Sequence, residues 1–292
     1  MAEWTGANGK RVLLTGATAG IGLAAAEQLA ARGAKLAIVA RSEEKAADAV
    51  TRIQAAAEGD TEVDVLLADF ASQASVRRLA AEVLDRYPRL DVLVNNAGAL
   101  NSSRELTEDG LELTWAVNHL GPFLLTNLLL DRLKESAPAR IVTTASDAHK
   151  GARIPFDDLN ADRSYRGRGF GRYGQTKLAN ILFTAELGRR LEGSGVTANC
   201  FHPGVVATGF NRNNGPIMSA LMMLVRPFSR SPEKGAETLV YLVDSPDVSE
   251  ENGAYFVDER RATPSKEAQD MEAAARLWEV SEEQTREGAA AG

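Results

Sequence analysis

Short apolar runs alternate along the chain with longer, alanine-rich stretches of helical character. From residue 11 to about 257 the two kinds of segment follow one another, and no proline- or serine-rich linker separates them. A short run in which nearly every position is apolar is typical of a strand buried on both faces. The alternation therefore predicts an α/β fold in a single domain, with a parallel sheet between two layers of helices.

Seven strands and six helices are expected within these limits. The strands are at 11–15, 35–40, 62–68, 91–95, 140–145, 196–201 and 254–258, and the helices at 21–32, 43–57, 73–86, 107–134, 173–192 and 232–243. Right-handed crossovers force a doubly wound, Rossmann-type sheet, in which ligands bind at the carboxyl ends of the strands where the winding reverses. We expect residues 1–258 to form one dinucleotide-binding and catalytic domain. Residues 259–292, with a helix over about 265–283, should pack on the same domain and fray at the end.

Composition disfavours several classes of function. The net charge of −7 argues against a general nucleic-acid binder, which needs a basic face. The stretch "RSYRGRGFGRY" (163–173) resembles RNA-binding arginine-glycine segments, but it is short, which favours a solvated loop beside the site. The lone Cys200 excludes an internal disulfide. We expect neither a signal peptide nor an integral membrane segment, and a cytoplasmic location by default.

The first expected strand ends in "TGATAGIG" (15–22), a turn that opens a helix. Its glycines let the backbone turn tightly and approach a pyrophosphate, whose charge meets free N–H groups at the start of the helix. The alternative is a glycine-rich turn that serves only strand-to-helix packing. The position after the first strand of an α/β chain favours the dinucleotide. The residues of this turn expected to bind it are Gly16, Thr18, Gly20, Ile21 and Gly22.

Arg41 ends the second expected strand, in "IVARSEE". An acidic residue at this place usually holds the ribose 2′-hydroxyl of NAD, whereas an arginine suits the 2′-phosphate of NADP. We therefore expect NADP, with NAD less favoured. The alternative is an exposed arginine that precedes Ser42 as a helix cap.

Two further strand ends are expected to meet the cofactor. Asp69, in "LLADF", either accepts a hydrogen bond from the adenine amino group or orients the next helix. "NNAG" (95–98) either lets the backbone pass close to the cofactor or forms an ordinary turn. The residues of this second motif assigned to the cofactor are Asn95, Ala97 and Gly98.

"YGQTK" (173–177) places Tyr173 and Lys177 on one face of an expected helix. Tyrosine titrates near 10, so a proton shuttle near neutral pH needs its pKa lowered by about 3 units. A nearby ammonium, aided by a positive nicotinamide ring, has the right sign of charge. Alone, the spacing equally fits a pair on a solvated helix. Ser146 and Asn118 favour the catalytic interpretation, because the topology returns both to the same edge of the sheet. Each also has a structural alternative: Ser146 can be a strand-end cap, and Asn118 a hydrogen-bonded helix amide.

These motifs, together with "HPGVVAT" (202–208), occur in the order and spacing of the short-chain dehydrogenase/reductase family, which the chain resembles over nearly its whole length. "DAHKGARIPFDDLN", "KLANILFTAEL" and "ARLWEVSEE" are similar to the retinol dehydrogenase-like branch. The resemblance implies that Tyr173 is the general acid/base and that Ser146 hydrogen-bonds the substrate oxygen. It also implies that Lys177 contacts the nicotinamide ribose and lowers the phenol pKa, and that Asn118 holds a water in a proton relay.

The resemblance extends to the segment that would meet the nicotinamide end of the cofactor, with Thr208 near the carboxamide. The residues concerned are Pro203, Gly204, Val206 and Thr208. Two departures make the substrate less certain. Ala145 stands where the branch often has a second serine, and an insertion around 163–172 lengthens the path from Ser146 to Tyr173.

Together these features predict an NAD(P)-dependent oxidoreductase that transfers a hydride between nicotinamide and the carbonyl or alcohol carbon of a bulky apolar substrate. A lid over about 209–231, with the methionine-rich core "IMSALMMLV", would suit that substrate. A subunit contact, a core helix or a membrane-surface patch are alternatives for this segment.

The rival interpretation is a non-catalytic NADP-binding sensor or scaffold protein on the same fold, which the intact tetrad disfavours. No metal is expected, because the three histidines are far apart in sequence and none has ligand spacing. A homodimer or homotetramer would match the assemblies of relatives, by analogy alone.

Overall fold

The computed structural model describes residues 3–57, 61, 63–165, 167–206 and 229–286. Within them, one sheet has the strand order β3-β2-β1-β4-β5-β6-β7-β8. β1 to β7 run parallel to their neighbours, which confirms the predicted Rossmann-type α/β fold. The strands are β1 Arg11–Thr15, β2 Lys35–Ala40, β3 Val63–Leu67, β4 Val92–Asn95, β5 Ala139–Thr144, β6 Val196–His202, β7 Tyr255–Val257 and β8 Arg260–Ala262.

β8 was not predicted, and it makes the sheet eight-stranded and mixed rather than seven-stranded and parallel. It runs antiparallel to β7, with Val257 opposite Arg260. Asp258 and Glu259 join the two strands with φ angles of 50° and 61°, as expected for a two-residue hairpin turn. The strand escaped prediction because its two exposed arginines carry no apolar signal. Short, charged strands of this kind are usual at a sheet edge.

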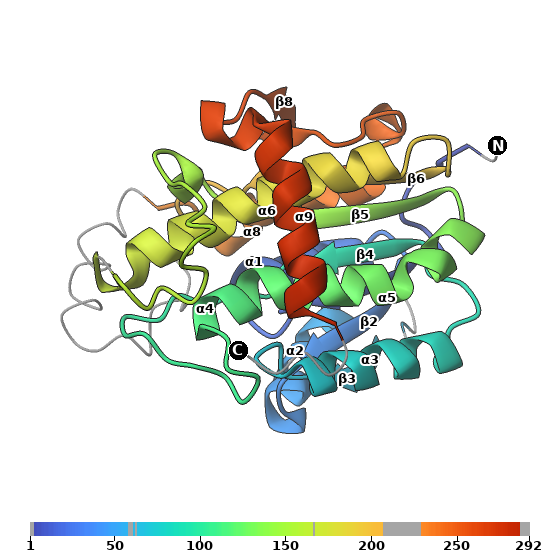
Figure 1. The fold of residues 1–292 in the computed structure, drawn as a ribbon. Coiled ribbons are helices and arrows are strands. Elements are labelled where there is room, and N and C mark those ends of the chain that lie inside the picture. The colour runs from blue at the N-terminus through green and yellow to red at the C-terminus, as the bar shows by residue number, and fades with distance from the viewer. Residues whose placement is uncertain (1–2, 58–60, 62, 166, 207–228, 287–292) are drawn as a thin grey trace.

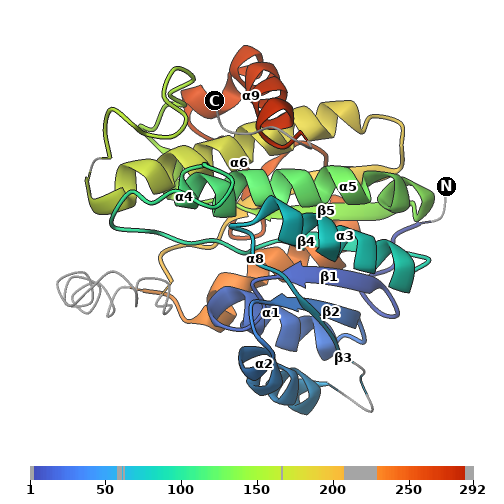
Figure 2. The ribbon, with the colours of Figure 1, turned by 60° about the horizontal axis from the view of Figure 1, so that its bottom comes forward.

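Helices cover both faces of the sheet (Figures 1 and 2). The main helices are α1 Gly20–Ala30, α2 Glu43–Ala56, α3 Gln73–Arg86, α5 Gly121–Glu135, α6 Phe170–Arg190, α8 Pro232–Asp244 and α9 Met271–Gln284. α1, α2 and α8 share one core with the sheet, whereas α3, α5 and α6 share another, with α9 packed on α6. Val12 and Leu14 of β1 join the first core and Leu13 joins the second. Alternate side chains therefore bury both faces of the central strand.

The segment expected as one helix over 107–134 is instead three pieces. α4, Leu113–Trp115, leads into a π-helical turn, Ala116–Leu120, and then into α5. The helix begins only at residue 113 because the Glu112 carboxylate caps it, accepting from the amides of Thr114 and Trp115, each at 2.9 Å. The π turn carries Asn118, and inserted turns of this kind often occur at functional sites.

The C-terminal prediction also needs correction. The helix expected over 265–283 is a 3₁₀ turn, Lys266–Gln269, followed by α9. Asp270 separates them and caps α9, accepting from the amides of Glu272 at 3.1 Å and Ala273 at 3.0 Å. The lid expected over 209–231 lies almost wholly outside the described residues. In the described part of the chain, no helix combines the length and apolar character needed to cross a membrane.

Candidate functional site

The winding of the sheet reverses at β1, which has β2 on one side and β4 on the other. Ligands of doubly wound sheets bind at the carboxyl ends of the strands beside such a point. The turn after β1 lies there, with φ angles of 68° at Gly16 and 55° at Gly20. A methyl group on Gly16 would lie 2.8 Å from the Cα atom of Ala97, and one on Gly22 would lie 2.1 Å from the Gly16 carbonyl oxygen. Side chains at positions 16 and 22 would therefore block the turn.

Asn96 connects this turn to the neighbouring strands. Its side-chain nitrogen donates to the carbonyl oxygens of Thr15 at 3.1 Å and Gly16 at 3.2 Å. Its side-chain oxygen accepts from the Thr144 hydroxyl of β5 at 3.1 Å. Asn95 instead points into the core and donates to a threonine hydroxyl of α5. Asn95 was expected at the cofactor and Asn96 was not, because the sequence does not tell which of two adjacent side chains faces the turn after β1.

α1 begins beside this turn without a side-chain cap, since its N-cap residue is Ala19. The first N–H groups of a helix have no partner within it and favour an anion. Thr18 belongs to the same turn, and Ile21 lies in the first turn of α1. The start of this helix therefore has the character of a phosphate site.

The segment after β6 reaches the same place. Pro203 is buried, and Gly204 has a φ of 83°. A methyl group on Gly235 of α8 would lie 2.6 Å from the Val206 side chain and 3.3 Å from that of Ile21. The Val206 and Ile21 side chains therefore both lie against Gly235 of α8. Thr208 lies outside the described residues.

Arg41 and Asp69 stand at the carboxyl ends of β2 and β3. Arg41 is exposed, and no hydrogen bond or ion pair joins it to another described residue. Ser42 occupies the N-cap position of α2, but its side chain makes no capping hydrogen bond. Asp69 is exposed too, and one of its carboxylate oxygens accepts from the Ala71 amide at 2.9 Å. That contact fits the alternative in which Asp69 orients the next helix, and it leaves the second oxygen for another partner.

Ser146 and Tyr173 come together despite the insertion between them. Ser146 follows β5 and caps the short turn Asp147–His149, accepting from the Ala148 amide at 3.2 Å. Its side chain is also hydrogen-bonded to that of Tyr173. Tyr173 is half-buried, and the Lys177 ammonium lies 5.5 Å from the centre of its ring. The structure therefore gathers these three side chains at the end of β5.

Lys177 and Asn118 converge on Gly98. The buried Lys177 ammonium donates to the Thr144 carbonyl oxygen at 2.8 Å, and a methyl group on Gly98 would lie 3.8 Å from its nitrogen. The same methyl group would lie 3.4 Å from the Asn118 side-chain oxygen. Asn118 is fully buried and bonds the Ala99 backbone at 2.7 and 2.8 Å and the Thr176 hydroxyl at 3.0 Å. It thereby fastens the loop after β4 to α6.

The protonation of the two groups on α6 is governed by burial. Burial raises the pKa of Tyr173 to about 12, against a smaller lowering by the hydrogen bond from Ser146. Burial lowers the pKa of Lys177 to about 8. The groups of the chain therefore leave the phenol protonated at neutral pH. The expected lowering of the Tyr173 pKa has to come from charge that binds beside it.

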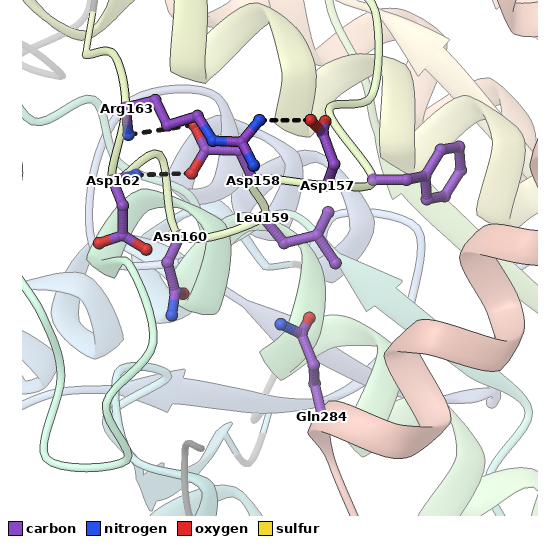
Figure 3. Close-up of a pocket in the computed structure, with 8 residues that line it drawn as sticks. Asp157, Asp158, Leu159, Asn160, Asp162, Arg163 and Gln284 are labelled. Atoms are coloured by element: carbon purple, nitrogen blue, oxygen red, sulfur yellow. Dashed lines mark hydrogen bonds and ion pairs between the residues drawn. The ribbon is translucent and has the colours of Figure 1, made fainter.

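A separate pocket of about 380 Å³ opens on the loop after the short turn that follows β5 (Figure 3). Its charges are already paired: Asp157 binds Arg163 at 2.5 Å, and Asp158 accepts from the amides of Asp162 and Arg163. The residues that line it are Phe156, Asp157, Asp158, Leu159, Asn160, Asp162, Arg163 and Gln284. None of the predicted site residues is among them. In the described part of the chain, no group of three or more His, Cys, Asp or Glu side chains is arranged to hold a metal ion.

The doubly wound sheet and the glycine turn at its reversal define a Rossmann-type protein of the kind that binds dinucleotides. Residues 10–157 match the family model described as short chain dehydrogenase. The chain is 44% identical to mouse retinol dehydrogenase 14 over 94% of its own length and 85% of that protein. It is 42% identical to human retinol dehydrogenase 13 over 92% of its length and 82% of that protein. The chain belongs to the short-chain dehydrogenase family, and its resemblance to the retinol dehydrogenase-like branch is confirmed.

Solved structures agree with this assignment. An uncharacterized protein from Mycobacterium paratuberculosis aligns with a TM-score of 0.77 and 34% identity, over 97% of this chain and 98% of that one. A short chain dehydrogenase from Burkholderia cenocepacia in complex with NADP aligns with a TM-score of 0.68 and 30% identity, over 86% and 96%. The family is one of oxidoreductases that use a nicotinamide cofactor.

Proposed function

We propose that the protein is an oxidoreductase that transfers a hydride between NADP and the carbonyl or alcohol carbon of a bulky apolar substrate, with Tyr173 as the general acid/base. The observation that carries the proposal is the convergence of four side chains at one crevice. Ser146 is bonded to Tyr173, and Lys177 and Asn118 meet beside Gly98. A protein that only sensed the cofactor would have no use for a half-buried phenol and a buried ammonium in this arrangement.

The turn after β1 and the loop after β4 support a nicotinamide dinucleotide as the cofactor. The glycine turn exposes backbone at the uncapped start of α1, where the helix dipole favours phosphate. The loop after β4 approaches Lys177 and Asn118 through Gly98. When bound, the cofactor supplies or accepts the hydride. We assign its contacts to Gly16, Thr18, Gly20, Ile21, Gly22, Arg41, Asp69, Ala97, Gly98, Pro203, Gly204, Val206 and Thr208, with Asn95 in support from the core.

The side chains of the crevice then divide the handling of the proton. The Tyr173 hydroxyl gives the proton to the substrate oxygen during reduction, or takes it during oxidation. Ser146 holds that oxygen and the phenol together. Lys177 uses one of its three donors on Thr144 and keeps two for the ribose. Its ammonium and the oxidised nicotinamide ring are positive, and both favour the phenolate.

The preference for NADP follows from Arg41. It is exposed at the end of β2 and unpaired among the described residues, and the neighbouring Ser42 hydroxyl makes no capping bond. A guanidinium and a hydroxyl at this place offer donors to a 2′-phosphate. The B. cenocepacia dehydrogenase of similar fold was solved with NADP.

The apolar character of the substrate follows from the relatives and from the rim of the site. The curated relatives are named for retinol, a large apolar alcohol. Phe170, one turn before Tyr173 on α6, is 42% exposed, and Val205 beside the glycine of the segment after β6 is 54% exposed. Large exposed apolar side chains next to proposed site residues in the sequence suit an apolar ligand.

The test is a screen of apolar aldehydes, ketones and alcohols, including retinal and retinol, with both cofactors. Turnover should require Tyr173, so Tyr173→Phe should abolish it while the dissociation constant for NADPH stays within about twofold of wild type. Tyr241→Phe, on α8 across the sheet, is the matched control and should keep full activity. Tight NADPH binding without turnover on any substrate would favour a sensor or scaffold instead.

A further inference from the structure

A buried ion pair lies directly beside the proposed general acid/base. Arg172, the residue before Tyr173, donates from Nε to a Glu112 carboxylate oxygen at 2.6 Å. The exposed fractions of the two side chains are 1% and 0%. The guanidinium also stacks over the Trp115 ring, 4.7 Å from its centre. Neither charged residue has a part in the proton or cofactor chemistry proposed above.

The pair joins two of the elements that carry proposed site residues, the π turn with Asn118 and α6 with Tyr173 and Lys177. On one side, the two Glu112 oxygens accept from the amides of Thr114 and Trp115, so this carboxylate starts the turn that continues into the π helix with Asn118. On the other side, Arg172 lies in the first turn of α6 and donates to Gln175 one turn later at 3.1 Å. Figure 1 shows α4 beside the beginning of α6.

The loop just before the insertion around 163–172 is fastened to the same pair. Arg172 donates to the carbonyl oxygen of Leu159, and the Glu112 amide donates to the side-chain oxygen of Asn160 at 3.1 Å. Both of these partners lie along the loop drawn in Figure 3. Tyr165 adds a third link, because its hydroxyl donates to the Asn101 carbonyl oxygen at 2.8 Å and lies 3.2 Å from that of Thr114.

The backbone before Tyr173 has little helical support of its own. Arg168 and Gly169 have left-handed φ angles of 50° and 84°, so α6 begins abruptly at Phe170. A methyl group on Gly169 would lie 1.9 Å from the Asn101 carbonyl oxygen, so the chain passes in close contact with the loop after β4. The N-cap residue is Gly169, which makes no side-chain capping bond, and an uncapped helix start frays readily unless a tertiary contact holds it. The ion pair supplies that contact within one residue of the phenol.

We infer that Glu112 and Arg172 are positioning residues that set the first turn of α6, and with it the Tyr173 phenol, relative to Ser146 and Asn118. The inference rests on the proposed function for its kinetic consequence. A buried ion pair seldom adds stability over apolar groups of similar size. The planar guanidinium of Arg172, however, presents its donors in a fixed arrangement and so specifies one geometry. An apolar pair would fill the same volume and leave the start of the helix free to shift.

Four variants separate positioning from stability. Arg172→Met and Glu112→Gln each leave a buried group without its partner and should lower the melting temperature. The double variant Glu112→Gln/Arg172→Met removes both buried charges and should recover part of that loss, because one capping amide and the Leu159 carbonyl oxygen stay unpaired. Arg172→Lys keeps the charge without the fork and should fall between the wild type and Arg172→Met.

The expected result is a loss of turnover that stability does not explain. In the double variant kcat should fall by about 30- to 100-fold, because a misplacement of about 1 Å can cost that much, while the KM for NADPH changes by less than about threefold. Arg140→Met is the matched control. Arg140 is also buried, donates to the Leu242 and Val243 carbonyl oxygens and lies over Trp4, but it stands at the amino end of β5. This variant should lower the melting temperature and leave kcat unchanged.

Recovery of kcat together with the melting temperature in the double variant would overturn the inference, and so would an equal loss of kcat in Arg140→Met. Crystal structures of the double variant and the wild type test the inference without a turnover assay, because they show the position of the Tyr173 phenol relative to Ser146. A phenol displaced from Ser146 supports the inference, and an unmoved phenol refutes it. Failure of the proposed function itself would appear separately, as full turnover in Tyr173→Phe.

Discussion

Replacing Gly22 by alanine is expected to break the turn after β1. The new methyl group would lie 2.1 Å from the Gly16 carbonyl oxygen and 2.4 Å from the side-chain nitrogen of Asn96. Carbon and oxygen atoms in contact stand about 3.3 Å apart, so the turn must open by roughly 1 Å. Overpacking of this kind costs about 1–3 kcal/mol, and each lost hydrogen bond from Asn96 adds about 1 kcal/mol. The two bonds at risk are those to Thr15 and Gly16.

The free energy of unfolding of Gly22→Ala should therefore fall by about 3–5 kcal/mol. At about 2–4 °C per kcal/mol for a chain of this size class, calorimetry should record a melting temperature lower by roughly 6–20 °C. Titration of NADPH fluorescence, carried out well below that temperature, should give a dissociation constant raised at least about tenfold, or about 1.4 kcal/mol. The reason is that the displaced backbone forms the expected pyrophosphate site.

Gly9→Ala is the control for this variant. Gly9 precedes β1 at the opposite end of the strand, with a φ of 70° and no atom within 4 Å of the added methyl group. The left-handed backbone should cost about 1–2 kcal/mol of stability and leave NADPH binding unchanged. Wild-type affinity and melting temperature in Gly22→Ala would refute the steric reasoning. Equal weakening of NADPH binding in both variants would show that general destabilisation, rather than the turn, controls affinity.

Three further variants test charge and protonation. Arg41→Asp should reduce the ratio of kcat/KM for NADPH over NADH by roughly 10- to 100-fold, since charge-assisted bonds to the 2′-phosphate are lost; an unchanged ratio would contradict the assignment. Burial lowers the pKa of His119 to about 3. Below about pH 6.5 the unfolded chain therefore binds a proton at this histidine and the folded chain does not, so the free energy of unfolding decreases as the pH falls. In His119→Gln the slope of unfolding free energy against pH, measured between pH 6 and 4, should be shallower by about 1.4 kcal/mol per unit; equal slopes would exclude this source. Hydrogen bonds from Arg189 and Arg190 lower the pKa of Glu186, and its contribution is present above the ordinary carboxyl pKa and lost below it. The difference in melting temperature between wild type and Glu186→Gln should thus be largest near pH 7 and shrink towards pH 3, and a constant difference would rule out the ion pairs as its cause.

The sequence predicted the parts of the fold whose signal is local. A strand buried on both faces, such as β1, must be apolar along its length, and this pattern is visible without a structure. The π turn that carries Asn118 has no such signal. It forms where Glu112 caps α4 from outside and Asn118 bonds the loop after β4, and both contacts cross between segments. Elements that depend on such contacts cannot be read from hydrophobic pattern alone.

The site divides in the same way. Glycine turns and the Tyr-Lys spacing are local features, so the sequence located them, although their chemical roles remain proposals. Asn96 was missed because two adjacent asparagines look alike until the strand direction is known. Arg172 was assigned to a solvated loop because four arginines among glycines carry no sign of which one is buried. Its partner Glu112 lies 60 residues away, and only the fold brings the two together.

The two ends of the crevice are joined by one shared residue. The Thr144 hydroxyl donates to Asn96, which holds the turn after β1, and the Thr144 carbonyl oxygen accepts from Lys177 at 2.8 Å and from Asn180 at 3.3 Å. A change at the turn that displaces Asn96 must therefore break the hydrogen bond from the Thr144 hydroxyl to the Asn96 side-chain oxygen. The Thr144 carbonyl oxygen orients the Lys177 ammonium on α6. A displacement of the turn after β1 should therefore also change the geometry around Tyr173, the proposed proton shuttle. The added methyl group in Gly22→Ala would lie 2.4 Å from the Asn96 side-chain nitrogen as well as 2.1 Å from the Gly16 carbonyl oxygen. This variant should therefore lose kcat at saturating NADPH as well as affinity for it.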